Sequence, residues 1–303
     1  MSLPRTPSRS LAPWALPAVL SLLVPLALLG ACGDKGTTMN GSPDMAITLP
    51  PLFSADKPME MASMACNGKF ADPLVAAAMD TEVTGVVKDF QDDNLVSGAI
   101  VTLYATPDQV TNKTPIATSM PSAMDGTFKI TVPKGSARVI RGVAGGSAIS
   151  SGIMKPTIPA FEFGIRWDDK SPIAVKVATR EALSGLISVT QMDGLGVVAG
   201  ATHDCEDKTM GGANVTVFGG DGKTVVGQGP YYFVDAAGST VPSRNAKYTG
   251  EGGVFASFNI PVGTAAISAV GVIGAGASVP VSKATVPVIA DAITIIHLLP
   301  LAQ

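Results

Sequence analysis

Residues 125–135 read Asp125-Gly126-Thr127-Phe128-Lys129-Ile130-Thr131-Val132-Pro133-Lys134-Gly135. The Asp-Gly pair favours a tight turn, because glycine readily adopts the left-handed backbone that such turns need. After the turn, apolar and polar side chains alternate over six residues, which is the pattern of a β-strand with one buried face. Pro133 ends the strand at a position where no amide donor is needed. The stretch predicts a turn and an antiparallel strand, with Phe128 in the core.

The same order of residues recurs about a hundred residues later. Four segments of the first copy have counterparts: Thr84-Gly85-Val86-Val87 in Ser184-Gly185-Leu186-Ile187, Gly98-Ala99-Ile100-Val101 in Gly212-Ala213-Asn214-Val215, Gly126-Thr127-Phe128 in Gly253-Val254-Phe255, and Val132-Pro133-Lys134-Gly135 in Ile260-Pro261-Val262-Gly263. In this match, the interval from Gly185 to Gly212 in the second copy is longer than the corresponding interval from Gly85 to Gly98 in the first. The second copy is therefore expected to carry an insertion near residues 190–211. A duplicated module explains the repeat better than chance. Phe255, like Phe128, is expected in the core.

These motifs resemble the carboxypeptidase regulatory-like domain, whose members have a transthyretin-like (prealbumin-like) β-sandwich. The resemblance covers residues 81–145 well and 183–272 more loosely. It implies an all-β fold with two tandem antiparallel β-sandwich domains, Ig-like in architecture, over residues 81–180 and 181–303. The resemblance also implies a structural or ligand-contacting accessory module rather than an enzyme.

The N-terminus has the layout of an export signal, with Arg5 and Arg9 before an apolar run over residues 11–29. The run ends in Leu29-Gly30-Ala31-Cys32, which resembles the lipobox of bacterial lipoproteins. The resemblance implies that residues 1–31 are removed and that a lipid on Cys32 anchors the chain to a bilayer of the cell envelope. Gly33 in place of Asp favours the outer membrane. The alternative is a retained transmembrane helix, which three prolines in the run oppose.

Residues 32–80 are interpreted as a tether that ends in a short helical segment. Residues 33–65 are rich in small, polar and proline residues and have no sustained periodicity, which predicts a disordered spacer. Residues 66–80 carry apolar residues at helical spacing, namely Phe70, Leu74, Val75 and Met79.

The cysteine count predicts one disulfide. The chain has three cysteines, and if Cys32 is lipidated, Cys66 and Cys205 remain. Two remaining cysteines in an oxidising compartment usually form a disulfide. The alternative is a pair of free thiols, buried or bound to a metal.

The composition and the histidines disfavour enzyme and nucleic-acid functions. The 303 residues carry a net charge of −3, and only 15% of them are charged, which argues against a nucleic-acid partner. Neither G-x-S-x-G nor H-E-x-x-H occurs, and there are only two histidines. His203 begins a run of metal-competent residues to Asp207, interpreted as a polar surface loop because the sequence shows no further zinc ligands nearby. His297 is expected to be half-buried in an apolar strand. No cofactor is expected.

Two groups of residues suggest ligands. Tyr231, Tyr232 and Trp167 could stack on sugars as a carbohydrate platform, and simple packing is the alternative. Met59, Met61 and Met64 precede Cys66 as a group of soft ligands suited to Cu(I). The sequence thus predicts a non-catalytic envelope lipoprotein with a structural, adhesive or ligand-binding role, whose partner is a glycan or another envelope protein. The alternative is an envelope copper-handling protein.

Overall fold

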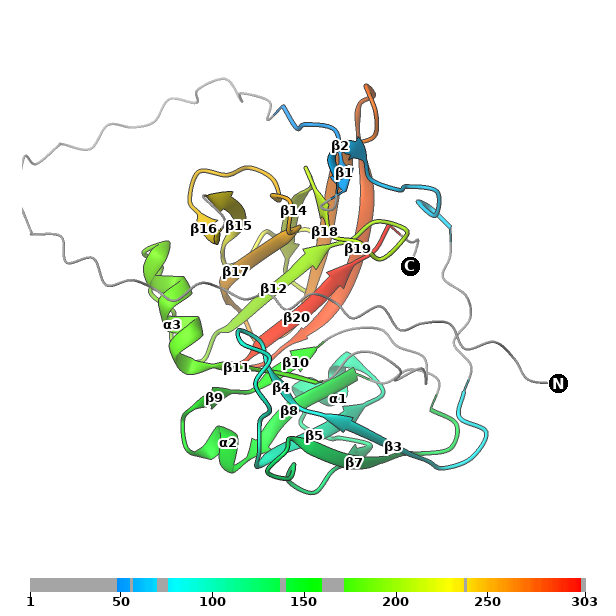
Figure 1. Ribbon diagram of the computed structural model, residues 1–303, viewed down its shortest axis with the longest axis vertical. Helices are drawn as coiled ribbons and strands as arrows, with labels where there is room; N and C mark the ends of the chain where they lie inside the picture. The colour runs from blue at the N-terminus through cyan, green and yellow to red at the C-terminus, as the bar shows by residue number, and fades with distance from the viewer. Residues whose placement is uncertain are drawn as a thin grey trace, which may run out of the picture. The chain divides into compact units, whose positions relative to one another are not determined.

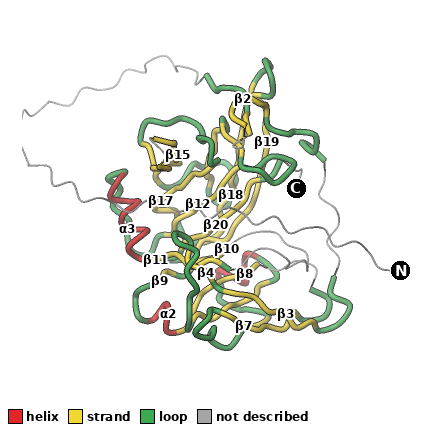
Figure 2. The backbone as a smooth tube through the Cα atoms, in the orientation of Figure 1, coloured by secondary structure: helices red, strands yellow, loops and turns green. Residues whose placement is uncertain are grey.

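The computed structural model describes residues 48–54, 57–69, 76–136, 140–159, 172–236 and 239–300. The expected signal peptide, Cys32, most of the expected tether and Trp167 lie outside these residues. The all-β prediction is confirmed: in the described part, strands form five sheets (Figure 2). Helices there are short: α1 (Pro107–Thr111), α2 (Ser147–Ser150) and α3 (Val177–Leu186). None of these described helices is long and apolar enough to cross a membrane.

The first copy of the repeat is a β-sandwich. One sheet pairs β3 (Thr81–Val86) antiparallel with β7 (Thr127–Val132). The other places β5 (Ala99–Tyr104) between β6 (Ala117–Thr118) and β8 (Ile140–Gly146). Burial alternates along β7 as the sequence predicts, with Phe128, Ile130 and Val132 in the core between the sheets.

The second copy is a larger sandwich. Its first sheet joins β14 (Asn214–Phe218), β18 (Gly263–Val272) and β19 (Ser278–Val288). The opposite sheet contains β12 (Gly196–Thr202), β15 (Gln228–Ala236), β16 (Ser239–Ser243), β17 (Val254–Ile260) and β20 (Ile293–Leu298). Phe255 is fully buried in the core between them, as predicted from its equivalence to Phe128.

The strand register corrects the way in which the two copies were matched. Gly85 faces Phe128 across β3 and β7, and Gly200 faces Phe255 across β12 and β17. The counterpart of Gly85 is therefore Gly200, while Gly185 lies in α3. The match of residues 184–187 to residues 84–87, and with it the insertion expected near 190–211, was wrong, because the helix-forming residues before Gly185 outweigh its local likeness to Gly85.

The other glycine matches hold. Each matched pair has positive φ in both copies: Gly98 and Gly212 (71° and 86°), Gly126 and Gly253 (71° and 65°), and Gly135 and Gly263 (83° and 133°). A buried hydroxyl also repeats. The Ser122 hydroxyl oxygen accepts from the Ala99 amide (2.9 Å), and the Thr249 hydroxyl oxygen accepts from the Ala213 amide (3.1 Å). Two copies of one module share this backbone geometry.

The two copies also share a sheet. Strand β10 (Thr157–Pro159) pairs antiparallel with β8 and parallel with β20, and so forms one nine-stranded sheet with order β16-β15-β17-β12-β20-β10-β8-β5-β6 (Figure 1). Strands β4 (Lys88–Asp89), β11 (Ile173–Lys176) and β9 (Met154–Lys155) form a small separate sheet. Strand β11 continues directly into α3. The expected domain boundary at 180–181 falls inside α3.

Part of the expected spacer is a structural element of the second copy. Strands β1 (Phe53–Ser54) and β2 (Lys57–Met61) form a sheet with β13 (Met210–Gly211). Leu52 is 2% exposed in the core of the second sandwich. Its amide donates to the Val272 carbonyl (2.8 Å). The spacer interpretation is therefore wrong for residues 51–54 and 57–61, because strands this short pair through their backbone and need no periodic pattern. Of the expected helix over 66–80, residues 70–75 lie outside the described part, and residues 76–80 are not helical.

Candidate functional site

The disulfide joins the N-terminal segment to the second sandwich. Cys66 and Cys205 are bonded, as predicted, with their Cα atoms 5.6 Å apart and a sequence separation of 139. The backbone supports the link, since the Cys205 amide donates to the Ser63 carbonyl (2.8 Å). The Ser63 amide donates to a carboxylate oxygen of Asp204 (3.2 Å). The N-terminal segment is thus attached to the second copy by a strand pairing at β1, a core side chain at Leu52 and a covalent bond at Cys66.

The acidic run around Cys205 builds a turn. Asp204 is 2% exposed, and its Oδ1 accepts from the amides of Glu206 (2.8 Å) and Lys208 (3.1 Å). Its own amide donates to the Lys208 carbonyl (2.8 Å). Asp204 therefore has a structural role that fixes the position of Cys205. The expected polar surface loop is correct for Glu206 but not for Asp204 or His203, which are buried.

The structure does not assemble the expected tyrosine pair into a sugar-binding platform. Tyr232 is 2% exposed; its hydroxyl accepts from the Val215 amide (2.8 Å) and donates to the Val215 carbonyl (3.2 Å). Burial raises the pKa of this hydroxyl to about 12. Tyr231 packs edge-on against Phe258, with ring centroids 6.1 Å apart. Trp167 lies outside the described residues. Tyr232 was wrongly assigned to a ligand surface, because strand β15 turns it into the core.

The structure also does not assemble a copper site at residues 59–66. The Cys66 sulfur is bonded to Cys205, so it is not a thiolate ligand. Met64 packs against the second core, while Met61 is largely exposed. The Met59 side chain lies outside the described atoms. The spacing of the methionines predicted one copper site shared with Cys66. The disulfide removes the Cys66 thiolate, which was the only anionic ligand of that site.

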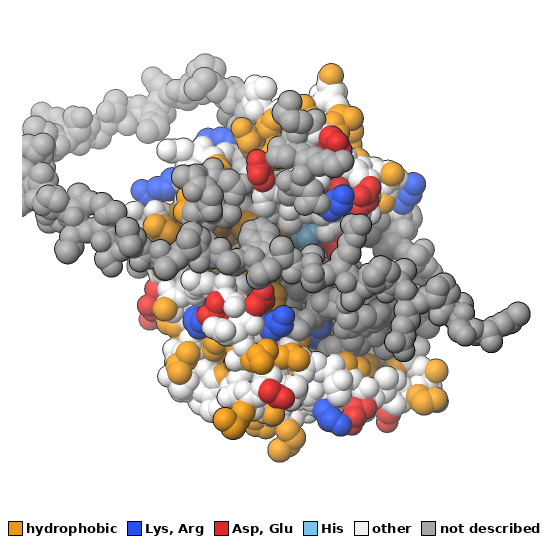
Figure 3. Space-filling model, viewed as in Figure 1, with side chains coloured by type: hydrophobic (Ala, Val, Ile, Leu, Met, Phe, Trp, Pro, Cys, Tyr) orange, Lys and Arg blue, Asp and Glu red, His pale blue; other side chains and the backbone are white. Residues whose placement is uncertain are grey.

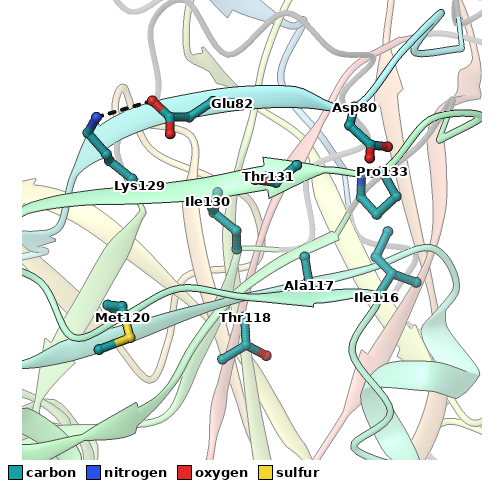
Figure 4. A pocket seen from close by; sticks show the side chains of 10 residues that line it. All are labelled: Asp80, Glu82, Ile116, Ala117, Thr118, Met120, Lys129, Ile130, Thr131 and Pro133. Carbon is teal, nitrogen blue, oxygen red and sulfur yellow. Dashed lines mark hydrogen bonds and ion pairs between the residues drawn. The ribbon is translucent and has the colours of Figure 1, made fainter.

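A groove lies on the first sandwich, between β7 and the strand β6 (Figure 4). Its volume is about 440 Å³. An exposed ion pair between Lys129 and Glu82 (3.1 Å) lies at its edge, and Ile130 and Ala117 lie within it. Its ten lining residues supply carboxylates, a lysine, threonines and apolar groups, but neither a histidine nor a cysteine. The groove therefore offers both charged and apolar contacts to a ligand.

No known protein family matches this sequence, and no curated protein matches it either. Among solved structures, the TIE protein of Bacillus anthracis is 14% identical over 72% of this chain and 33% of that one, with a TM-score of 0.23. The shaft pilin SpaA of Lactobacillus rhamnosus GG is 13% identical over 74% and 99%, with a TM-score of 0.22. The streptococcal ancillary pilin is 12% identical over 72% and 68%, with a TM-score of 0.23. The chain spans about a third of the length of the first of these proteins. The strand pairings described above remain the basis for the fold.

Proposed function

We propose that this chain is a lipid-anchored envelope protein with a non-catalytic structural or adhesive role. In this proposal the second sandwich carries the anchor, and the first sandwich is presented to a partner. The path of the chain supports it most directly. Strand β1 pairs with β13 of the second copy, Leu52 lies in the core of that copy, and Cys66 is bonded to Cys205. Tension that enters at a lipid on Cys32 then reaches the second sandwich through a covalent bond and bypasses residues 81–180.

The loops of the first sandwich supply a surface for the partner. Phe90, Leu95 and Met124 are each at least half exposed, and Met124 is 95% exposed. Their loops adjoin, because a side chain added at Gly126 would lie 3.2 Å from the Leu95 Cβ atom. Figure 3 shows acidic and basic side chains interspersed on one face of the molecule, with hydrophobic side chains among them. Grouped exposed apolar residues favour a protein partner, so we expect another envelope protein.

A site-specific photo-crosslinking experiment tests the partner surface. A photoreactive residue replaces Met124 in the loop of the first copy, and a matched control replaces Met192, a half-exposed methionine of the second copy. Irradiation of native envelopes is expected to yield a protein adduct from position 124 and none from position 192. Equal adducts at both positions, or none at position 124, would contradict the proposed surface.

The anchor is tested separately on Cys32. We expect mass spectrometry of the mature chain to find a diacylglyceryl group on Cys32, and the Cys32→Ala variant to leave the membrane fraction. An unmodified Cys32 would refute the lipid anchor, while the crosslinking result at position 124 would still decide the partner surface.

A further inference from the structure

The fold brings together the only two histidines of the chain, which are 94 residues apart in sequence. Strands β12 and β20 run parallel, with Ala201 opposite His297. Just beyond β12, the His203 amide donates to the Leu298 carbonyl (2.9 Å). The two imidazole rings stack with their centroids 4.3 Å apart and 22° between their planes. The two histidines meet only because β12 and β20 pair, so the sequence around either histidine does not predict their contact.

Asp207 adds a carboxylate to this pair. It lies in the turn that holds Cys205, with φ of 60°. Its Oδ1 lies 3.0 Å from Nδ1 of His203, and its carbonyl oxygen lies 3.1 Å from the same nitrogen. One ligand atom each from His203, Asp207 and His297 lies within 4.8 Å of the others. In a tetrahedral shell, ligand atoms about 2.0–2.2 Å from one ion lie about 3.3–3.6 Å apart. The side chains therefore have to rotate inward, by about an ångström at their ligand atoms, to converge on one ion.

The imidazole of His203 is held beside Asp207. Its side chain is 8% exposed. Because Asp207 faces Nδ1, an ion that binds both residues lies on the Nδ1 side of the ring and replaces the proton that Nδ1 otherwise shares with the carboxylate. The other ring nitrogen, Nε2, is buried without a hydrogen-bond partner among the described residues and faces away from Asp207.

We propose that His203, His297 and Asp207 form a binding site for a divalent transition-metal ion of the zinc class. Two imidazoles and a carboxylate suit Zn²⁺, and water can complete a four-coordinate shell. The carboxylate of Glu206 in the same turn is paired with Lys208 (3.3 Å) and is not part of the cluster. A bound ion would join β20 to the turn of Cys205 and so reinforce the second sandwich beside the disulfide. The site lies away from the proposed partner surface and does not depend on that function.

The experiment titrates the full-length, oxidised chain in detergent, stripped of metal, with Zn²⁺ by calorimetry. Co²⁺ serves as a second probe, because its visible spectrum reports the coordination geometry. The principal variant is His297→Gln, since His297 is half-buried and His203 is buried enough that its replacement can disturb the fold. Asp207→Asn is a second variant. Glu206→Gln is the matched control, a carboxylate of the same turn that lies outside the cluster.

We expect one Zn²⁺ per chain, with affinity lowered at least about 100-fold in His297→Gln, because the loss of a group that only supports a ligand already costs about 10–100-fold. Glu206→Gln should bind as the wild type does. Co²⁺ should give a tetrahedral spectrum that His297→Gln lacks. Circular dichroism of each variant checks that the fold is intact. Absence of Zn²⁺ binding at micromolar concentrations, or equal affinity in the folded His297→Gln variant and the wild type, would overturn the proposal.

Discussion

Breaking the Cys66–Cys205 disulfide is expected to lengthen the chain under force, because the bond bypasses the first sandwich. The two cysteines are 139 residues apart, and strands β3 to β8 lie between them in sequence. An extended residue spans about 3.3–3.6 Å. While the bond is intact, the loop that it closes over 139 residues cannot be extended by a force on the two ends of the chain. The fully stretched oxidised chain is therefore shorter than the reduced chain by roughly 460–500 Å.

Single-molecule force spectroscopy measures this length directly. The full-length chain is pulled between handles at its two ends, first oxidised and then in reductant. We expect the final contour length to increase by roughly 460–500 Å on reduction. We also expect the unfolding events of the first sandwich to occur only after reduction. The Cys66→Ser/Cys205→Ser variant is the control, since reductant should not change its length. Equal contour lengths for the oxidised and reduced chains would refute the proposed force path.

Three further predictions concern the two cores. Phe128→Ala should lower the free energy of unfolding by about 3–5 kcal/mol in urea titrations, because the ring is buried between the sheets; a loss below about 1 kcal/mol would contradict its place in the core. Gly200→Ala should lower the melting temperature more than Gly85→Ala. The new methyl group overlaps the Ile296 carbonyl oxygen in the first variant, whereas in the second it meets an aromatic side chain at 2.8 Å; the reverse order would contradict this register. Burial raises the pKa of Tyr232 from 10.0 to about 12, so its neutral form stabilises the fold fully below pH 10 and this contribution disappears as the pH rises through 12. Urea titrations of Tyr232→Phe between pH 9 and 12 should show a shallower loss of stability than the wild type, and identical slopes would refute the assignment.

Local signals predicted a large part of this fold. The Asp125-Gly126 turn and the alternation after it depend only on neighbouring residues, and the structure has both. The three matched glycine pairs were also found from local motifs, because a left-handed backbone favours glycine whatever the chain does next. Phe255 was placed in the core by its position after Gly253 alone. The cysteine pairing followed from the number of cysteines and the expected compartment.

Long-range pairing could not be predicted in the same way. Gly185 lies in a sequence like that of Gly85, but it belongs to a helix, whereas the true counterpart Gly200 follows a turn at Gly194. The parallel pairing of β12 and β20 joins segments almost a hundred residues apart, so the contact between His203 and His297 left no local signal. A two-residue strand such as β1 shows no periodicity, and composition alone assigned it to a spacer.

The repeat explains why the N-terminal segment packs on the second copy. In the first copy, a side chain at Gly98 would overlap Ser147 at the start of α2. In the second copy, a side chain at the equivalent Gly212 would meet the Pro51 carbonyl oxygen at 2.9 Å. The same position of the module is thus covered by α2 in one copy and by the N-terminal segment in the other. Strand β18 continues through a turn into β19 and supplies no such cover. The segment that leads from the expected anchor therefore completes the second sandwich, and the first sandwich is the part that the disulfide leaves outside the path of force.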